Sequence, residues 1–531
     1  MVVPELKAWR AARPRVVRVA RSVRPQLLRA VGAVKPPLVR AAGAVKPLVT
    51  RPSTVQFTAG SATLGLVVAA TVVTVAGPWD STGQRTAERD WAASQGRAGG
   101  ADHGHVSGTS GKAPAPAPSA ASVLTGLGGS VGAGPSPTEK ALADVLGPLL
   151  DNAALGSERA AAVVDLATGK RLYGKGADDA LTPASTTKIA TAVAALTAAG
   201  ADHRIATRTV LEPGAPDKQE VVLVGGGDPT LTAREDAEGN ASLRTLADKT
   251  ARALKDRKTD EVTLSYDTSL YEGPDVHPIG LDNTNVARVT ALMADEGRLD
   301  DTSSGTAKRS EEPAADAAKK FAELLNDRGI KTADPVPAKA TDRAKALATV
   351  KSPPLSALVE RMLTNSDNDI AEALARQTAV AADEPASFKG GGTAIREQLK
   401  KLGLPLKGVE FADGSGLDRA DKLTADLLTA LLAKAADPAH PELRAALTGL
   451  PVAGFTGTLS TRYAGQPGTG LVRAKTGTLT GVHTLAGTVV DTDGHLLAFA
   501  FLTASDPPTE PTATQKGLDA LASTLATCGC G

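Results

Sequence analysis

Three short motifs in this 531-residue chain carry hydroxyl, amine and amide groups suited to acyl transfer. The first joins Ser185 to Lys188, after Pro183 and at the start of an apolar helical pattern. Side chains three positions apart share one face of a helix, so the amine can reach the hydroxyl. A desolvated amine can take the proton of a serine, and backbone N–H groups at a helix start can stabilise an oxyanion. Taken alone, the motif fits an N-cap serine beside a solvated lysine better than a catalytic pair.

The second motif, Ser366-Asp367-Asn368, follows an apolar helix expected at 355–363. Ser366 could pass a proton, and the amide of Asn368 could both donate to and accept from a substrate amide. Taken alone, the motif fits an ordinary N-cap for a helix expected at 370–379 better than a catalytic role.

The third motif is Lys475-Thr476-Gly477-Thr478, on a strand that follows Val472. Glycine in a strand allows a ligand to approach the backbone, and the lysine and hydroxyls offer a positive, hydrogen-bonding edge to a carboxylate. Taken alone, a solvated edge strand is a fair interpretation. However, Ser-x-x-Lys, Ser-x-Asn and Lys-Thr-Gly each occur once, in this order, on a helix start, an interhelical loop and a strand. The combination is far more specific than its parts.

Together the three motifs resemble the active-site signature of penicillin-binding proteins and serine β-lactamases. Three further stretches resemble the D-alanyl-D-alanine carboxypeptidase/endopeptidase group, the low-molecular-mass class C penicillin-binding proteins: 225–231, 413–417 and 454–459. The resemblance covers roughly residues 138–526. It implies an α+β penicillin-binding fold with an inserted lobe, peptidoglycan stem peptides as substrates, β-lactams as acylating inhibitors, and neither a metal nor a cofactor.

The resemblance also implies a role for each motif residue. Ser185 would be the acylated nucleophile and Lys188 its general base. Ser366 and Lys475 would relay the proton to the leaving D-alanine, while Asn368 would bind the peptide amide of the donor. Because Lys188 must be neutral to act as a base, the neighbouring charge of Lys475 is expected to lower its pKa.

The remaining implied residues bind substrate, and they are Thr476, Gly477 and Thr478. The hydroxyls of Thr476 and Thr478 would lie near the terminal carboxylate. The backbone N–H groups of Ser185 and Thr478 would form the oxyanion hole.

Two other functions share these motifs. A class A β-lactamase needs a glutamate that activates the deacylating water, usually in Glu-x-x-Leu-Asn, and no glutamate between Ser366 and Lys475 is followed by Asn four positions later. A catalytically inactive, membrane-anchored penicillin-binding scaffold is the other alternative, and the intact motifs count against it.

The pattern of apolar residues predicts the elements that position the motifs. Residues 138–526 have predicted strands at both ends and helices between them. This order predicts an antiparallel sheet whose two halves are distant in sequence and which packs on a helical cluster. The expected helices are 141–150, 188–196, 355–363, 370–379, 392–402, 424–435 and 513–526, and the expected strands are 160–165, 171–173, 471–475, 483–491 and 496–503. The catalytic domain is expected to comprise 138–205 and 349–531, and the inserted lobe 206–348 to alternate short strands and helices with charged loops.

The first part of the chain differs in charge from the rest. Residues 1–51 hold 12 of the 59 basic and one of the 58 acidic residues, which leaves a net charge of −10 on the remainder. Residues 55–76 lack charge and are long enough for a transmembrane helix. The sequence therefore predicts a disordered basic cytoplasmic head (1–54), one membrane crossing, a flexible linker (77–137) and an extracellular body at the cell membrane. A cleaved signal peptide ending near Ala76 is the alternative.

Two features limit the remaining possibilities. Aromatic residues make up only 3% of the chain, which argues against nucleic acid as a partner and favours anionic lipid for the basic head. The only cysteines, Cys528 and Cys530, flank one glycine. A bridge between them would be strained, so mixed pairing and free thiols stay open alternatives.

Overall fold

A computed structural model describes residues 137–215 and 219–530. By internal contacts the chain divides into Met1–Pro118 and Ser119–Gly531, and every described residue belongs to the second unit. The predicted head and membrane helix, and the predicted linker except its last residue, lie outside the described residues. Within the described part of the chain, no helix is long and apolar enough to span a bilayer.

The catalytic domain is built on a five-stranded antiparallel sheet with the order β2-β1-β11-β10-β9. Its strands are β1 Glu158–Asp165, β2 Arg171–Lys175, β9 Arg473–Leu479, β10 Val482–Val490 and β11 Leu496–Ala504. Ala162 on β1 and Ala486 on β10 both pair with Ala500 on β11, which joins the two ends of the region. The predicted sheet of two distant halves is confirmed.

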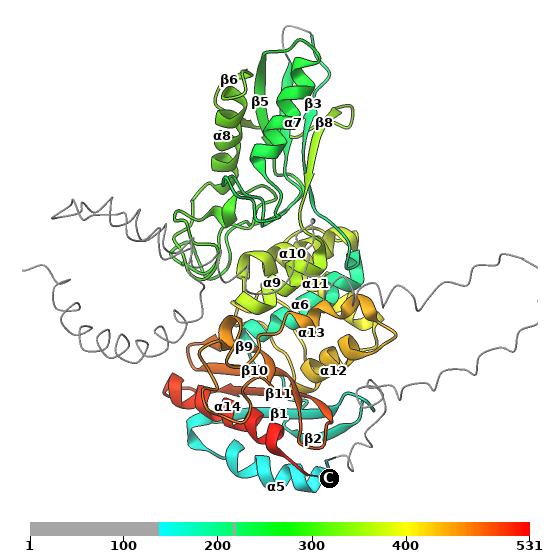
Figure 1. Cartoon of the computed structure of the whole chain (residues 1–531), viewed down its shortest axis with the longest axis vertical. Coiled ribbons are helices and arrows are strands. Elements are labelled where there is room, and N and C mark those ends of the chain that lie inside the picture. Colours follow the sequence, from blue (N-terminus) through cyan, green and yellow to red (C-terminus); the bar gives the residue numbers. More distant parts are fainter. Residues whose placement is uncertain (1–136, 216–218, 531) are drawn as a thin grey trace, which may run out of the picture. The chain divides into compact units, whose positions relative to one another are not determined.

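Alternate residues of the central strands bury both faces of this sheet. On β1, Ala160, Ala162 and Val164 pack on the helical cluster, whereas Ala161 and Val163 pack on the opposite layer. That opposite layer consists of α5 Glu139–Leu150 and α14 Pro511–Thr527 (Figure 1). The continuous apolar run of β1 therefore reflects burial on two sides.

The helical cluster forms the other layer (Figure 1). Its helices are α6 Thr187–Ala199, α9 Leu355–Asn365, α10 Asn368–Ala381, α11 Phe388–Lys401, α12 Ala425–Ala436 and α13 Ala445–Thr448. The predicted start of α11 at Gly392 is wrong by four residues, because Ser387 caps the helix by accepting the N–H of Gly390 at 3.0 Å. Glycine is needed in its first turns, since a Cβ at Gly392 would lie 2.1 Å from the carbonyl of Phe411.

The inserted lobe has its own sheet, with the order β6-β5-β4-β3-β8 and β7 paired to β5. The strands are β3 Ala206–Leu211, β4 Glu220–Val224, β5 Glu261–Asp267, β6 Lys331–Thr332, β7 Val336–Pro337 and β8 Lys345–Lys351. Two amphipathic helices, α7 Leu243–Lys255 and α8 Pro313–Asn326, cover one face and form a separate core with it. β8 runs across the predicted domain boundary at residue 348.

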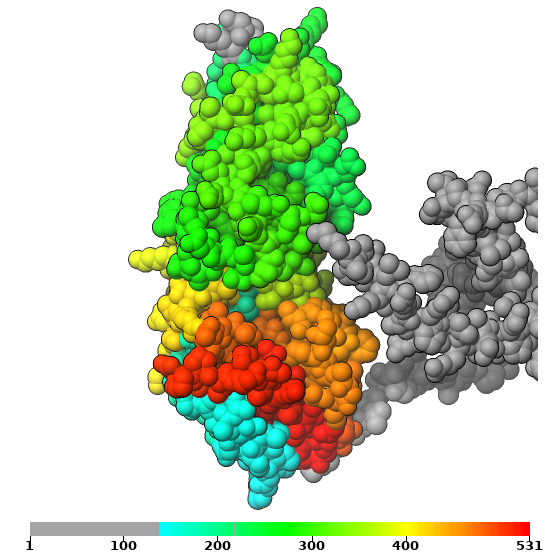
Figure 2. Space-filling model, turned by 90° about the vertical axis from the view of Figure 1, so that its left-hand side faces the viewer, coloured from blue at the N-terminus to red at the C-terminus, as the bar shows by residue number. Residues whose placement is uncertain are grey.

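Between β5 and α8, residues 268–312 form a long connection that contains only the short 3₁₀ helix Asp295–Gly297. The predicted alternation of strands and helices therefore fails for this part of the lobe. Buried Arg376 on α10 fastens the connection by donating to the carbonyls of Glu272 and Pro274, each at 3.0 Å. In Figure 2 the green atoms of the lobe adjoin the yellow and orange atoms of the helical cluster.

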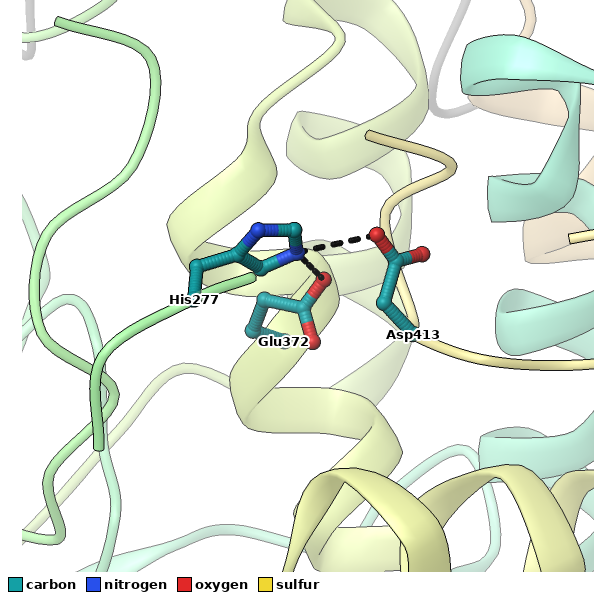
Figure 3. Close-up of side chains that lie close together, drawn as sticks. All are labelled: His277, Glu372 and Asp413. Carbon is teal, nitrogen blue, oxygen red and sulfur yellow. Dashed lines mark hydrogen bonds and ion pairs between the residues drawn. The ribbon is translucent and has the colours of Figure 1, made fainter. Parts of the chain in front are cut away.

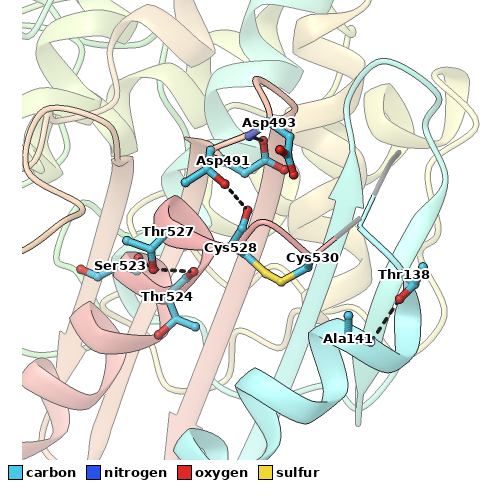
Figure 4. The surroundings of a disulfide bond; sticks show 10 residues. Thr138, Ala141, Asp491, Asp493, Ser523, Thr524, Thr527, Cys528 and Cys530 are labelled. Carbon is cyan, nitrogen blue, oxygen red and sulfur yellow. Dashed lines mark hydrogen bonds between the residues drawn. A yellow bond between two sulfur atoms is a disulfide. The ribbon is translucent and has the colours of Figure 1, made fainter. Parts of the chain in front are cut away.

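A disulfide joins Cys528 and Cys530 after the end of α14 (Figure 4). The alternatives of mixed pairing and free thiols do not apply to this structure, in which neither cysteine is free. The carbonyl of Cys530 accepts the N–H of Thr138 at 3.1 Å, and the carbonyl of Cys528 accepts the hydroxyl of Thr492 at 3.0 Å. The disulfide thus lies where the segment after α14 meets the start of α5, and it contains no residue of the three motifs.

Candidate active site

Ser185 lies in the 3₁₀ turn Ala184–Thr186 that leads into α6. Ala184 adopts φ +49°, an unusual conformation for alanine that places the serine at a sharp turn. The carbonyl of Pro183 accepts the hydroxyls of Thr186 at 2.7 Å and of Thr484, on β10, at 2.8 Å. The turn is therefore fixed to the sheet, and Ser185 is only half-buried.

The amine of Lys188 lies below Ser185, as the motif spacing predicts, and it is fully buried. It donates to Ser185 Oγ at 3.0 Å, to Asn368 Oδ1 at 2.7 Å and to the carbonyl of Ser415 at 2.7 Å. Burial lowers the pKa of Lys188 to about 8, while the nearby carboxylates, chiefly Asp413, oppose that shift. A base with this pKa is partly neutral at neutral pH.

Lys475, on β9, forms a second buried amine–hydroxyl pair with Ser366 at 2.8 Å. Burial, and then the charge of Lys188, lower the pKa of Lys475 well below its ordinary value. The expectation that the charge of Lys475 lowers the pKa of Lys188 needs correction. Burial is what lowers the pKa of Lys188, and the stronger depression falls on Lys475.

The Ser366–Asn368 motif forms the corner between α9 and α10. Ser366 ends α9 with φ +57°, and Asp367 caps α10 by accepting the N–H of Ile370 at 3.0 Å. Asp367 thus caps α10, and the hydroxyl of Ser366 is left to accept a hydrogen bond from Lys475. Asn368 begins α10, where its Nδ2 donates to the backbone carbonyl of Asn285 at 3.0 Å.

Thr476, Gly477 and Thr478 lie on β9, the last strand of the sheet. A Cβ at Gly477 would lie 2.1 Å from Thr484 Oγ1 and 2.7 Å from the carbonyl of Pro183. From the sequence, this glycine was expected to let a ligand approach the strand. In the structure, the turn that carries Ser185 packs closely against it. Thr476 Oγ1 donates to Thr458 Oγ1 at 3.0 Å.

A cavity of about 240 Å³ brings these motifs together above the two lysines. Its lining residues are Ser185, Asn285, Arg298, Gly305, Thr306, Arg309, Asn365, Ser366, Asp367, Asn368, Asp369, Leu417, Thr476 and Thr478. Larger hollows of about 750 and 960 Å³ lie at the lobe, and none of the predicted site residues lines them.

Two of the additional family-like stretches support the site. The 413–417 loop supplies the carbonyl of Ser415 to Lys188, and Gly416, at φ +82°, leaves no room for a Cβ against the carbonyl of Ala184. The 454–459 stretch supplies Thr458 to Thr476. The third, 225–231, lies at the base of the lobe, where the carbonyl of Gly226 accepts Gln377 Nε2 at 2.8 Å.

The sequence interpretation missed the wall of the cavity that comes from the lobe. Arg309 donates to Asp369 Oδ2 at 2.7 Å, and the backbone N–H of Ala287 donates to Asp369 Oδ1 at 2.8 Å. Burial raises the pKa of Asp369 to about 7, although Arg309 opposes that shift. Glu296 pairs with Arg298 at 2.8 Å and with Arg361 of α9 at 2.5 Å. No motif marks these residues. The only available signal was that 268–312 lacks helical or strand periodicity.

Two carboxylate clusters have the spacing of metal ligands within the described residues: His277 with Glu372 and Asp413, and Glu296 with Asp367 and Asp369. Both already contain protein counter-charges. The first holds the imidazole, and the second contacts three arginines. Ion pairing therefore accounts for both without a metal.

Comparison with known proteins identifies relatives along most of the chain. A family model described as the D-Ala-D-Ala carboxypeptidase 3 (S13) family matches residues 141–308 and 300–526. A carboxypeptidase of Mycobacterium tuberculosis is 35% identical over 440 residues, covering 80% of this chain and 92% of the relative. Carboxypeptidase DacB of Mycolicibacterium smegmatis is 37% identical over 411 residues, covering 75% and 86%.

The solved structures agree in fold. Penicillin-binding protein 4 of Haemophilus influenzae superposes with a TM-score of 0.60 at 22% identity, covering 73% of this chain and 99% of that one. The penicillin-binding-protein type of mixed α and β fold is thereby confirmed, including the sheet with its helical cluster.

Proposed function

The chain belongs to the D-Ala-D-Ala carboxypeptidase 3 (S13) family, and from that premise we propose that it hydrolyses the terminal D-alanyl–D-alanine bond of peptidoglycan stem peptides through an ester on Ser185. The reaction class is that of a serine-type D-Ala-D-Ala carboxypeptidase. One observation carries the assignment of the residues: the hydroxyl of Ser185 lies 3.0 Å from the buried amine of Lys188, at the floor of the 240 Å³ cavity.

In the acylation step the neutral amine of Lys188 takes the proton of Ser185 as its oxygen attacks the penultimate D-alanine carbonyl. The C–N bond then breaks, and the proton that Lys188 took from Ser185 passes by way of Lys475 and Ser366 to the amine of the leaving D-alanine. The 2.8 Å contact between Lys475 and Ser366 supports this route. Water then hydrolyses the ester and regenerates Ser185.

Electrostatic stabilisation of the oxyanion falls to the backbone N–H groups of Ser185 and Thr478, two residues that line the cavity. The hydroxyls of Thr476 and Thr478 face the terminal carboxylate of the substrate. The amide of Asn368 has its oxygen engaged by Lys188 and one N–H engaged by Asn285, so its second N–H is the group left for the donor peptide.

β-Lactams would acylate the same serine. A structure of Haemophilus influenzae penicillin-binding protein 4 is complexed with a β-lactam, and its fold matches this chain with a TM-score of 0.57. Nothing in the site favours a β-lactamase. Glu372 is buried, accepts the N–H of Gly414 with both oxygens and faces His277, and it does not line the cavity.

The cellular location rests on the sequence alone. The basic head, the uncharged 55–76 segment and the acidic remainder support a membrane-anchored enzyme whose catalytic domain is outside the cytoplasm.

The test uses the purified full chain, a fluorescent penicillin and stem peptides. We expect covalent label on Ser185, D-alanine release from a pentapeptide monomer, and neither in Ser185→Ala. D-Alanine release by Ser185→Ala would refute the mechanism, and rapid turnover of the label would indicate a β-lactamase. Products from a cross-linked dimer separate endopeptidase from carboxypeptidase preference.

A further inference from the structure

One buried side chain of the lobe reaches the loop that holds Lys188. His277, in the 268–312 connection, is buried and points its Nε2 at two carboxylates of the catalytic domain (Figure 3). Its Nε2 is 2.9 Å from Asp413 Oδ2 and 3.7 Å from Glu372 Oε1. The ring of Phe388 packs edge-on against the imidazole, with 5.3 Å between ring centroids. The histidine is thus enclosed on several sides and is separate from the cavity.

The two carboxylates that face His277 organise the backbone of the 413–417 loop. Asp413 accepts the N–H groups of Ser415 at 3.0 Å and Gly416 at 2.6 Å, and Glu372 accepts the N–H of Gly414 at 3.2 Å. The shape of the loop therefore depends on where these carboxylates are held.

The loop in turn holds the catalytic amine. The carbonyl of Ser415 accepts Lys188 Nζ at 2.7 Å, and the carbonyl of Gly414 accepts the hydroxyl of Thr191 at 2.6 Å, both from α6. Contacts therefore lead without a break from the lobe imidazole through Asp413 and Ser415 to Lys188. Rotation of the carboxylate of Asp413 would move the carbonyl that positions the amine.

We propose that His277 is a positioning residue through which the inserted lobe holds the 413–417 loop, and thereby the amine of Lys188, in the geometry that acylation requires. This inference rests on the proposed function. In the neutral imidazole, Nδ1 accepts the N–H of Ile279 at 3.2 Å and the proton is on Nε2; in the imidazolium both nitrogens carry protons and the Ile279 hydrogen bond is lost. Nε2 is therefore a donor to Asp413 in either protonation state.

The surrounding charges support this arrangement. Burial lowers the pKa of His277, and the hydrogen bonds and charges of Asp413 and Glu372 more than offset it, raising the pKa to about 9. The charged groups facing this region are Asp413 from the 413–417 loop, Asp421 just after it, Glu372 and Arg376 from α10, and Lys188 from α6. Because Asp413 and Glu372 raise the pKa of Lys188, loss of the imidazole leaves that effect less opposed.

The test compares His277→Met with His277→Gln in the full chain, because the amide of glutamine can replace the Nε2 donor and methionine cannot. We measure the second-order rate of Ser185 acylation by a fluorescent penicillin from pH 5.5 to 9.5, together with thermal unfolding. His277→Met should be slower by about 10- to 100-fold, and its pH midpoint should move above that of the wild type. His277→Gln should recover most of the rate and of the midpoint.

His203→Met is the matched control, since this histidine is exposed at the root of the lobe, and it should behave as the wild type does.

If His277→Met does not unfold cooperatively, His277→Asn replaces it, because its shorter amide falls short of Asp413. An unchanged rate and midpoint in the methionine variant overturns the inference, as does equal slowing of the methionine and glutamine variants. Sensitivity of the wild type to EDTA would overturn it too, by assigning the cluster to a metal. If the fluorescent penicillin does not label the wild type, the proposed function is refuted together with the inference.

Discussion

The two walls of the active-site cavity are held by different forces. The wall of the catalytic domain carries Ser185, Ser366 and Thr476 on elements anchored in the apolar cores of a sheet and its helices. The lobe wall carries Asn285, Arg298 and Arg309 on a connection without regular structure. It is fixed by ion pairs and by backbone hydrogen bonds to α9 and α10.

The two walls therefore have different roles: the catalytic-domain wall carries the reacting groups, and the lobe wall determines the charge and shape of the cavity. The groups that exchange protons lie on elements held by close packing in apolar cores, which keeps donor and acceptor within hydrogen-bond reach. The lobe wall contributes charge and enclosure, and buried ion pairs depend strongly on having both partners. Changes in the first wall should therefore affect chemistry, and changes in the second should affect binding and stability.

The largest effect should come from the first wall. Lys188→Met removes the base beside Ser185, and we expect kcat/KM for D-alanine release to fall by about 10³- to 10⁴-fold. Lys249→Met, at an exposed lysine of α7, should leave it unchanged. Steady-state kinetics on a pentapeptide measure both, and a loss below tenfold would argue against Lys188 as the base.

The lobe wall should respond differently. Arg309→Met leaves the buried carboxylate of Asp369 without its cation, so we expect a loss of about 3–5 kcal/mol in the free energy of unfolding. KM should rise about 10- to 100-fold with a smaller change in kcat. Asp369→Asn in the same protein should restore much of the stability. A fall in kcat with KM unchanged would contradict the division between the walls.

The pH dependence should report the amine of Lys188 and should not depend on the ion pairs of the lobe wall. Lys188, with its pKa lowered to about 8, is a base only when neutral, so kcat/KM should rise with pH and level off above about 8. Between pH 6 and pH 8 the increase should be about 50-fold, because the neutral fraction rises by that factor. The midpoint should be the same in Arg309→Met. A shift of the midpoint in that variant would show that the lobe wall also acts on the amine.

A smaller effect should follow from adding one methyl group to the first wall. Gly477→Ala would press a Cβ against Thr484 and the carbonyl of Pro183, so we expect a loss of about 1–3 kcal/mol in stability and about tenfold in acylation rate. Gly147→Ala is the matched control. No atom lies within 4 Å of its Cβ position in α5, and there alanine should stabilise the protein by about 0.5–1 kcal/mol. Urea unfolding of both variants provides the comparison.

The smallest effect should come from outside both walls. Replacing Cys528 and Cys530 by serine opens a very short loop, which should cost about 1–2 kcal/mol in the free energy of unfolding. Acylation should proceed at the wild-type rate. A clear loss of activity would mean that the end of α14 affects the site through the sheet.

Local patterns predicted much of the first wall. The spacing of Ser185 and Lys188 was enough to place them together, because a helix fixes that geometry from the chain alone. The start of α11 was misplaced because glycine opposes helix formation locally, and only the close packing against Phe411 explains its presence there. The close packing at Gly477 was not predicted for a similar reason, since its close neighbours, Pro183 and Thr484, are not its neighbours in sequence.

The reaction class was implied by the resemblance of the three motifs to a known family. The sequence by itself determined those motifs and the sheet built from both ends of residues 138–526. These depend on side-chain identity and on helix or strand periodicity, which act over a few residues. The tertiary structure decided that the pKa of Lys475 is lowered more than that of Lys188. It also decided which residue caps α10, and that residues 268–312 form one wall of the cavity. Desolvation and ion pairing depend on distances between groups far apart in the chain. No local pattern records how His277 comes to lie 2.9 Å from Asp413.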